Sequence, residues 1–255
     1  MDDKLYHLGF GKSDLGDIPV KTVLLSGDPE RARQIAHDYL ESPRVLSENR
    51  GLNSYLGEAG GVPVISATSG MGAPSLSIVV NELAQLGMRT IIRVGTSGSI
   101  QPHVNVGHVV VSSASYCLQG AAADIAPVAY PAVGDPYLTV ALADSAKKLG
   151  VEAHVGITAS VDTFYEGQGR VRGANAQLLR SHEGLVEEYR RLNVLNFEME
   201  AGTLFKMGSV YGFRAACVCA IIAQRTESED VILDQKGKAV ENAIRVAVET
   251  VKGIR

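Results

Sequence analysis

Short apolar runs alternate with longer amphipathic stretches along nearly all of this chain of 255 residues. The short runs have the length and composition of strands, whereas the longer stretches repeat apolar residues at helical spacing. The expected strands are Thr22–Ser26, Val62–Ala67, Thr90–Val94, His108–Ser113, His154–Ala159 and Ala215–Ala223, and the expected helices are Pro29–Tyr39, Pro74–Leu86, Pro136–Leu149, Met199–Tyr211 and Lys238–Lys252. This alternation predicts an α/β fold.

The same alternation favours a largely parallel or mixed central sheet flanked by helices. With 45% hydrophobic residues, the chain can bury one large core, and we expect a single domain over residues 1–255. Ligands of such α/β sheets bind at the carboxyl ends of the strands. Functional side chains are therefore expected at those ends.

The formal net charge of −4 argues against a nucleic acid partner, because proteins that bind nucleic acids normally carry a strongly basic face. The first residues lack a basic region followed by an apolar core, and no apolar run approaches membrane-spanning length. We expect a cytoplasmic protein that binds neither nucleic acid nor a membrane.

The three cysteines, Cys117, Cys217 and Cys219, do not suggest a disulfide framework. Cys217 and Cys219 face the same way if they lie on a strand, so a metal-binding pair is one interpretation. Buried, unreactive thiols are the favoured interpretation, because no histidine or further cysteine stands nearby in the sequence. We expect no metal site.

A segment rich in glycine, serine and threonine, residues 95–100, follows the expected strand Thr90–Val94. We interpret it as a loop whose backbone N–H groups and hydroxyls turn toward one point. Arg93, just inside the strand, adds a positive charge there. The junction therefore predicts an oxyanion site, most simply for phosphate.

A second junction of this kind follows the expected strand Thr22–Ser26. Gly27 lets the backbone approach a ligand closely, Pro29 is suited to open a helix, and Arg31 reaches back from the first turn. Taken alone, either junction is more simply an ordinary turn beside a surface arginine. Their equivalent positions after two strands favour one shared anion pocket.

Residues 162–170 place aromatic side chains just before Gln168 and Arg170 in a glycine-interrupted loop. A glutamine donor and acceptor beside an arginine fork match the O2, N3–H and O4 edge of uracil, and Phe164 can pack on the ring. The alternative is that Gln168 and Arg170 are plain exposed loop residues.

Glu198, Met199 and Glu200 stand at the start of an expected helix. Carboxylates are favoured there by the helix dipole whatever their function, so helix capping is one interpretation. A carboxylate beside an apolar methionine also suits a ribose, whose two hydroxyls can donate to it. Arg225, at the end of the expected strand Ala215–Ala223, would complete the polar side of the same pocket.

Five ordered motifs carry a resemblance that covers nearly the whole chain: GDPER (27–31), ELAQLGMRTIIRVGTSGSIQPH (82–103), DTFYEGQGR (162–170), NFEMEA (196–201) and IIAQR (221–225). Together they resemble the nucleoside phosphorylase-I family. The Gln168–Gly169–Arg170 run is similar to its uridine-specific branch, and the aspartate of the purine branch after the last strand is replaced by Ala223–Gln224–Arg225.

The resemblance implies phosphorolysis of uridine to uracil and ribose 1-phosphate, with selectivity among uridine, deoxyuridine and thymidine left open. Arg93, Gln168, Arg170 and Arg225 would be the catalytic residues. The implied contacts are Gly27, Arg31, Arg50, Arg93 and Thr96 to phosphate, His7, Thr96, Met199 and Glu200 to ribose, and Ser97, Gly98, Phe164, Gln168, Arg170 and Ile222 to the base.

The resemblance also implies a mixed sheet partly closed into a barrel and a trimer of dimers. His7 and Arg50 would be donated to the neighbouring subunit. Phosphate is the co-substrate, and no cofactor is expected. Gly51 stands where similar enzymes carry a glutamate that helps to bind potassium, which leaves the Met71 carbonyl and the Ser75 hydroxyl, so we expect that site to be lost.

Two other functions stay open for such a sequence. A nucleosidase would use water, but phosphate-binding arginines would then have no purpose. A nucleoside- or phosphate-binding protein without catalysis would show binding and no turnover. Uracil release from uridine with and without phosphate separates these alternatives.

Overall fold

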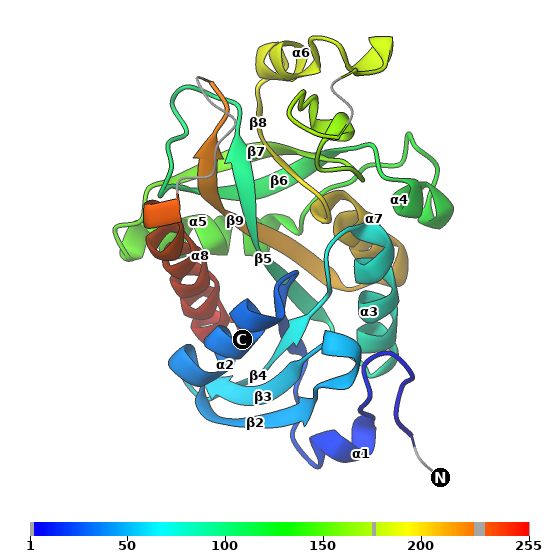
Figure 1. The fold of residues 1–255 in the computed structure, drawn as a ribbon. Coiled ribbons are helices and arrows are strands. Elements are labelled where there is room, and N and C mark those ends of the chain that lie inside the picture. Colours follow the sequence, from blue (N-terminus) through cyan, green and yellow to red (C-terminus); the bar gives the residue numbers. More distant parts are fainter. Residues whose placement is uncertain (1–2, 175–176, 227–232, 255) are drawn as a thin grey trace.

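The computed structural model of the chain describes residues 3–174, 177–226 and 233–254 (Figure 1). The strands are β1 (Thr22–Ser26), β2 (Glu41–Ser47), β3 (Ser54–Ala59), β4 (Val62–Thr68), β5 (Thr90–Ser99), β6 (Val109–Cys117), β7 (Ala153–Ser160), β8 (Val194–Glu198) and β9 (Arg214–Gln224). The helices are α1 (Lys12–Leu15), α2 (Pro29–Tyr39), α3 (Ala73–Gln85), α4 (Gly120–Ile125), α5 (Pro136–Lys148), α6 (Leu185–Arg191), α7 (Ala201–Tyr211) and α8 (Leu233–Gly253), with short 3₁₀ turns at Asn49–Gly51, Glu166–Gln168 and Arg180–His182.

In the described part of the chain, nine strands form one sheet in the order β2-β3-β4-β1-β5-β8-β7-β6-β9. Strand β1 pairs in parallel with β4 and β5, whereas β3 is antiparallel to β2 and β4. Strand β9 pairs back onto β5, which closes β5, β8, β7, β6 and β9 into a barrel. The predicted α/β class and the mixed, partly closed sheet are both confirmed.

Helices cover both faces of the central strands (Figure 1). Helices α5 and α8 pack on one side of β9, and α3 and α7 lie on the other. Successive residues of β9 follow this division, because Val218 belongs to the core under α8, and Cys217 and Cys219 belong to the core under α7. A strand buried on both faces explains why its sequence is continuously apolar.

Strand β5 is longer than its sequence predicts. The expected end at Val94 and the loop at residues 95–100 are wrong, because β5 pairs with β9 from Thr90 to Ser99. The glycines reflect crowding rather than a turn: a Cβ atom on Gly95 would lie 2.8 Å from the Cys219 sulfur. The small residues therefore let β5 and β9 pack closely as the barrel closes.

Several elements were not predicted, among them β2, β3, β8 and the short helices α1, α4 and α6. The helix expected from Met199 begins at Ala201, since residues up to Glu198 extend as β8. Within residues 3–174, 177–226 and 233–254, no helix combines the length and the apolar character needed to cross a membrane.

Candidate functional site

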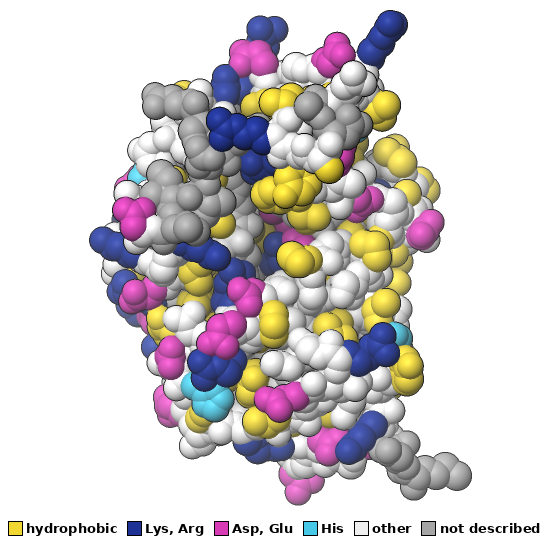
Figure 2. Space-filling view, in the orientation of Figure 1, with side chains coloured by type: hydrophobic (Ala, Val, Ile, Leu, Met, Phe, Trp, Pro, Cys, Tyr) yellow, Lys and Arg dark blue, Asp and Glu magenta, His cyan; other side chains and the backbone are white. Residues whose placement is uncertain are grey.

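A pocket of about 380 Å³ lies where the carboxyl ends of β1, β5, β8 and β9 come together. Figure 2 shows a hollow near the middle of the molecule with basic and acidic side chains around it. The sequence-predicted residues that line the pocket are Gly27, Arg31, Arg93, Thr96, Ser97, Gly98, Phe164, Gln168, Arg170, Met199, Glu200 and Ile222. Residues far apart in the sequence thus meet at one site.

The turn between β1 and α2 forms one wall. The Asp28 side chain accepts a hydrogen bond from the Glu30 backbone N–H at 2.9 Å, which caps α2 where Pro29 opens it. Arg31 follows in the first turn, is buried, and donates from Nη1 to the Val94 carbonyl at 3.3 Å. Burial lowers the pKa of Arg31 from its ordinary value, yet a guanidinium remains charged near neutral pH.

Arg93 is held from two sides. Its Nε donates to Glu198 Oε2 at 3.1 Å, and its Nη2 pairs with Glu200 Oε2. Burial alone would lower the pKa of this guanidinium, but the charges of Glu200 and Glu198 raise it above its ordinary value. Among the described residues, the Arg93 Nη1 atom has no hydrogen-bond partner, although it is buried at the pocket wall.

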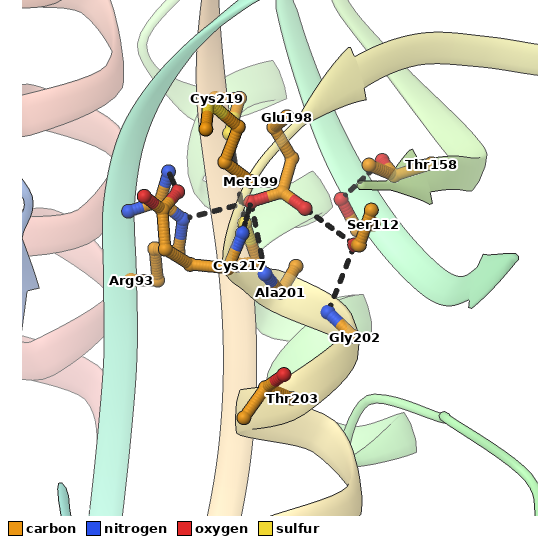
Figure 3. A network of polar contacts seen from close by, with 12 residues as sticks. Arg93, Ser112, Thr158, Glu198, Met199, Ala201, Gly202, Thr203, Cys217 and Cys219 are labelled. Atoms are coloured by element: carbon orange, nitrogen blue, oxygen red, sulfur yellow. Dashed lines mark hydrogen bonds and ion pairs between the residues drawn. The ribbon is translucent and has the colours of Figure 1, made fainter. Parts of the chain in front are cut away.

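Glu198 connects β8 to the start of α7. Its Oε2 accepts from the backbone N–H groups of Glu200 at 2.8 Å and Ala201 at 2.9 Å, and its Oε1 accepts from the Ser160 hydroxyl. Burial raises the pKa of this carboxyl, while the charge of Arg93 opposes that rise. Glu198 therefore has the capping role that the sequence left as one alternative, and it also orients Arg93 (Figure 3).

Glu200 is fixed just as firmly. Its Oε1 accepts from the Gly72 backbone N–H at 2.6 Å, while its other oxygen pairs with Arg93. The neighbouring Met199 lines the pocket, and its carbonyl accepts from Gln119 Nε2 at 2.5 Å. A fixed carboxylate and a methionine thus share one wall of the pocket.

The loop after β7 supplies the opposite wall. Gln168 and Arg170 are 3% and 6% exposed, so they are not plain surface residues. Gly169 between them has a φ of 65°, a conformation that favours glycine. The Arg170 guanidinium carbon lies 4.2 Å from the centre of the Phe164 ring, a cation–π contact that holds both side chains at the pocket.

Arg225 does not line the pocket. Its Nη1 donates to the Gln168 carbonyl at 2.9 Å, and its guanidinium lies 5.4 Å from the centre of the Phe197 ring. It therefore supports the loop that carries Gln168 from behind. Its expected place on the polar side of the pocket stays a prediction.

His7 and Arg50 also lie outside this pocket. His7 Nδ1 is 2.6 Å from Glu82 Oε1, beside a second hollow of about 590 Å³ between α3 and α4. Arg50 is exposed, with its guanidinium 5.7 Å from the centre of the Tyr6 ring. Neither side chain reaches the pocket of its own chain.

Several residues were not predicted to line the pocket: Asp28, Pro29, Met71, Phe197, Ala223 and Lys236. Asp28 and Pro29 belong to a motif whose glycine and arginine were singled out, so their part in the wall could have been inferred. Lys236 comes from α8, outside every motif, and no sequence signal pointed to it.

The sulfur atoms of Cys217 and Cys219 lie 3.6 Å apart, and both residues are buried. The contact with Cys219 and burial raise the pKa of Cys217 well above its ordinary value. No group of three or more histidine, cysteine or acidic side chains in the described ranges is arranged to hold a metal ion. These positions fit the interpretation of buried thiols.

Comparison with known proteins agrees with the motifs and the fold. Residues 21–252 match the model of the phosphorylase superfamily. A uridine phosphorylase of Escherichia coli is 41% identical over 97% of both chains, and one of Thermococcus kodakarensis is 41% identical over 97% of this chain and 85% of its own. A DeoD-type purine nucleoside phosphorylase of Oceanobacillus iheyensis is 31% identical over 96% of this chain and 98% of its own. With this match, the closed barrel and the arginine-lined pocket, the chain belongs to the phosphorylase superfamily.

Proposed function

We propose that this chain catalyses the phosphorolysis of uridine, with inorganic phosphate as co-substrate and no further cofactor. Relatives named uridine phosphorylase, at 41% identity over nearly the full length, support this substrate. The Gln168 and Arg170 pair supports it independently, because both side chains are buried at the pocket and match the polar edge of uracil.

The proposal rests mainly on two arginines with buried nitrogen atoms that lack hydrogen-bond acceptors. Among the described residues, Arg93 Nη1 and Arg31 Nε are buried without a hydrogen-bond acceptor. An unsatisfied buried donor costs about 1–3 kcal/mol, more when it is charged. A phosphate beside Gly27 would satisfy both donors. A Cβ atom on Gly27 would lie 3.9 Å from Arg93 Nη1, which places that donor next to the glycine turn.

Ribose would bind against Met199 and Glu200. Each carboxylate oxygen of Glu200 has already accepted one contact, from Gly72 or from Arg93. Each retains a second lone pair, so the carboxylate can still accept from sugar hydroxyls. Thr96 would contact both phosphate and ribose. The ion pair with Arg93 then connects the sugar subsite to the phosphate subsite.

The reaction moves negative charge from phosphate to the base. A phosphate oxygen forms a bond to C1′ as the bond from C1′ to N1 breaks, and the bonding electrons leave with uracil through an oxocarbenium-like state. Arg93 and Arg31 hold the nucleophile, while Arg170 and Gln168 stabilise the charge on the uracil oxygens. Arg225 acts by holding the Gln168 backbone.

A neighbouring subunit would complete this site. Arg50 would supply a further charge to the partner's phosphate, and His7 would contact the partner's ribose, in a dimer that repeats three times around a trimer axis. Arg50 is exposed, His7 is half-buried, and neither lines the pocket of its own chain, which supports donation outward.

Potassium would have no part in this assembly. Gly51 brings no carboxylate to this position. The Ser75 hydroxyl donates to the Ser69 carbonyl at 2.6 Å. Neutral oxygens alone compensate poorly for the lost hydration of a hard cation. The residues present do not fit the ion.

The test is uracil release from uridine, followed by absorbance in buffers with and without inorganic phosphate. We expect release only with phosphate, in proportion to its concentration until saturation. Equal release without phosphate would indicate hydrolysis instead. Binding of uridine with no release under either condition would indicate a binding protein.

A further inference from the structure

Lys236 lines the pocket from a helix that belongs to no recognised motif. It is the fourth residue of α8 as described, and it is half-buried. Within residues 3–174, 177–226 and 233–254, its ammonium group has neither a hydrogen bond nor an ion pair. A partly desolvated ammonium without a partner at a pocket wall is available to an anionic ligand.

The balance of charges around the pocket favours a phosphate-binding role for this ammonium group. Three carboxylates line the wall, from Asp28, Glu198 and Glu200. Among the described residues, the basic side chains that line this wall besides Lys236 are Arg31 and Arg93, because Arg170 is held against Phe164 at the base loop. The charges of these described lining residues therefore sum to a negative value if Lys236 is left out. A phosphate dianion needs a further positive charge from this chain or from its partner.

The position of Lys236 on its helix agrees with a role in binding an anion. The N-terminal part of a helix carries a partial positive charge, so a lysine there is less favourable than an acidic residue. Asp234, in the first turn of α8, follows that preference, and Lys236 does not. Helix electrostatics alone therefore do not account for the lysine.

We propose that Lys236 is a phosphate-binding residue. From α8 it supplies a positive charge at a wall where the carboxylates outnumber Arg31 and Arg93. This inference rests on the proposed function in that phosphate is the ligand. Its recognition element is the ammonium, so the same side chain would favour other small divalent oxyanions such as sulfate or arsenate.

Calorimetric titration of inorganic phosphate into the full-length chain tests the proposal, since it needs no turnover. Lys236→Met keeps the aliphatic stem and removes the charge, and Lys236→Arg keeps the charge. Lys238→Met is the matched control, because Lys238 is exposed on the same helix and does not line the pocket. Thermal unfolding of each variant establishes that it is folded.

We expect Lys236→Met to raise the phosphate Kd about tenfold or more, as is usual when a hydrogen bond to a charged group is lost. Lys236→Arg should stay within a few-fold of the unmodified chain, and Lys238→Met should match it. The KM for uridine should change less than twofold in Lys236→Met. If that variant misfolds, Lys236→Gln takes its place.

A phosphate Kd in Lys236→Met equal to that of Lys238→Met would overturn the proposal. So would a raised uridine KM with unchanged phosphate binding, which would place Lys236 at the base. A failure of the proposed function would look different. The unmodified chain would then bind phosphate through Lys236 and still release no uracil.

Discussion

Arg93 and Glu198 form a buried ion pair between β5 and the end of β8, with Nε 3.1 Å from Oε2 across 105 residues of sequence. The same carboxylate oxygen accepts from the backbone at the start of α7. One side chain thus fixes both the guanidinium that would hold phosphate and the helix start that presents Met199 and Glu200.

Glu198→Gln should cost about 3 kcal/mol of unfolding free energy, because it removes one partner of a buried pair. Glu187→Gln is the control, since Glu187 pairs with Arg190 on the surface at 2.6 Å. That exposed pair should contribute about 0.5 kcal/mol or less. Urea unfolding of both variants measures the difference, and equal losses would show that the Arg93–Glu198 pair is not a main support of the site.

Arg170→Ala should lower kcat on uridine about a hundredfold or more, because it removes a charge that acts most strongly as uracil departs. Phosphate binding should stay nearly unchanged. Arg172→Ala, two residues along the same loop and exposed, should keep normal turnover. Steady-state kinetics decide the matter, and near-normal kcat in Arg170→Ala would remove this loop from the base subsite.

Arg50→Ala and Arg93→Ala should each be nearly inactive as homomers but partly active when their subunits are mixed. In a mixed dimer, one of the two sites would combine an intact Arg93 with the partner's intact Arg50. Equal mixing should restore about a quarter of the sites. Activity is measured after co-refolding, with mixed oligomers verified by native mass spectrometry. Verified mixed oligomers without activity would mean that Arg50 does not serve the neighbouring site.

Replacing potassium with a bulky organic cation at constant ionic strength should change neither turnover nor the melting temperature. The reason is that Gly51 supplies no carboxylate and the remaining oxygen donors are neutral. Gly51→Glu tests the same idea in reverse, because it adds the missing carboxylate. The φ of 74° at this position disfavours any side chain. A drop in activity or stability of the unmodified chain without potassium would contradict the expectation.

Stability should fall as pH drops below about 6.5 in part through His154. Burial, with the charges of His108 and His103, lowers the pKa of His154, although Glu152 opposes the shift. Below the ordinary value of 6.5, the unfolded chain therefore binds more protons at this residue than the folded chain does. The linkage makes folding less favourable as pH falls toward the lowered pKa.

Melting temperatures at about pH 7.5 and pH 5.5 test this effect. The decrease should be smaller in His154→Gln than in the unmodified chain. His37→Gln, which changes an exposed histidine, should show the full decrease. Equal decreases in all three proteins would exclude His154 as a contributor.

The sequence predicted those helices and strands whose ends are marked by local signals such as caps and prolines. Strand β1 and helix α2 match their predicted bounds, because an apolar run leads into Asp28 as a cap and Pro29 as the first helical residue. Strand β2 has no such signal. Its residues are exposed or half-buried, and Pro43 interrupts them, so only its pairing with β3 makes it a strand.

Long-range contacts account for the errors. The residues of β5 after Val94 form a strand because β9 lies against them, which no local pattern reveals. In the site, too, local patterns were predictable and long-range contacts were not. Strand ends predicted that Gly27, Arg31 and Arg93 would meet, but the ion pair of Arg93 with Glu198 depends on how the barrel closes. The position of Arg225 behind Gln168 depends on it as well.

In the proposed reaction, one pocket joins phosphate to the sugar of uridine. Phosphorus NMR of the full-length chain with uridine and inorganic phosphate tests this most directly, because it observes the new bond rather than the loss of substrate. We expect a sugar 1-phosphate resonance that grows in step with free uracil and is absent without enzyme. Uracil released while all phosphorus stays inorganic would contradict it.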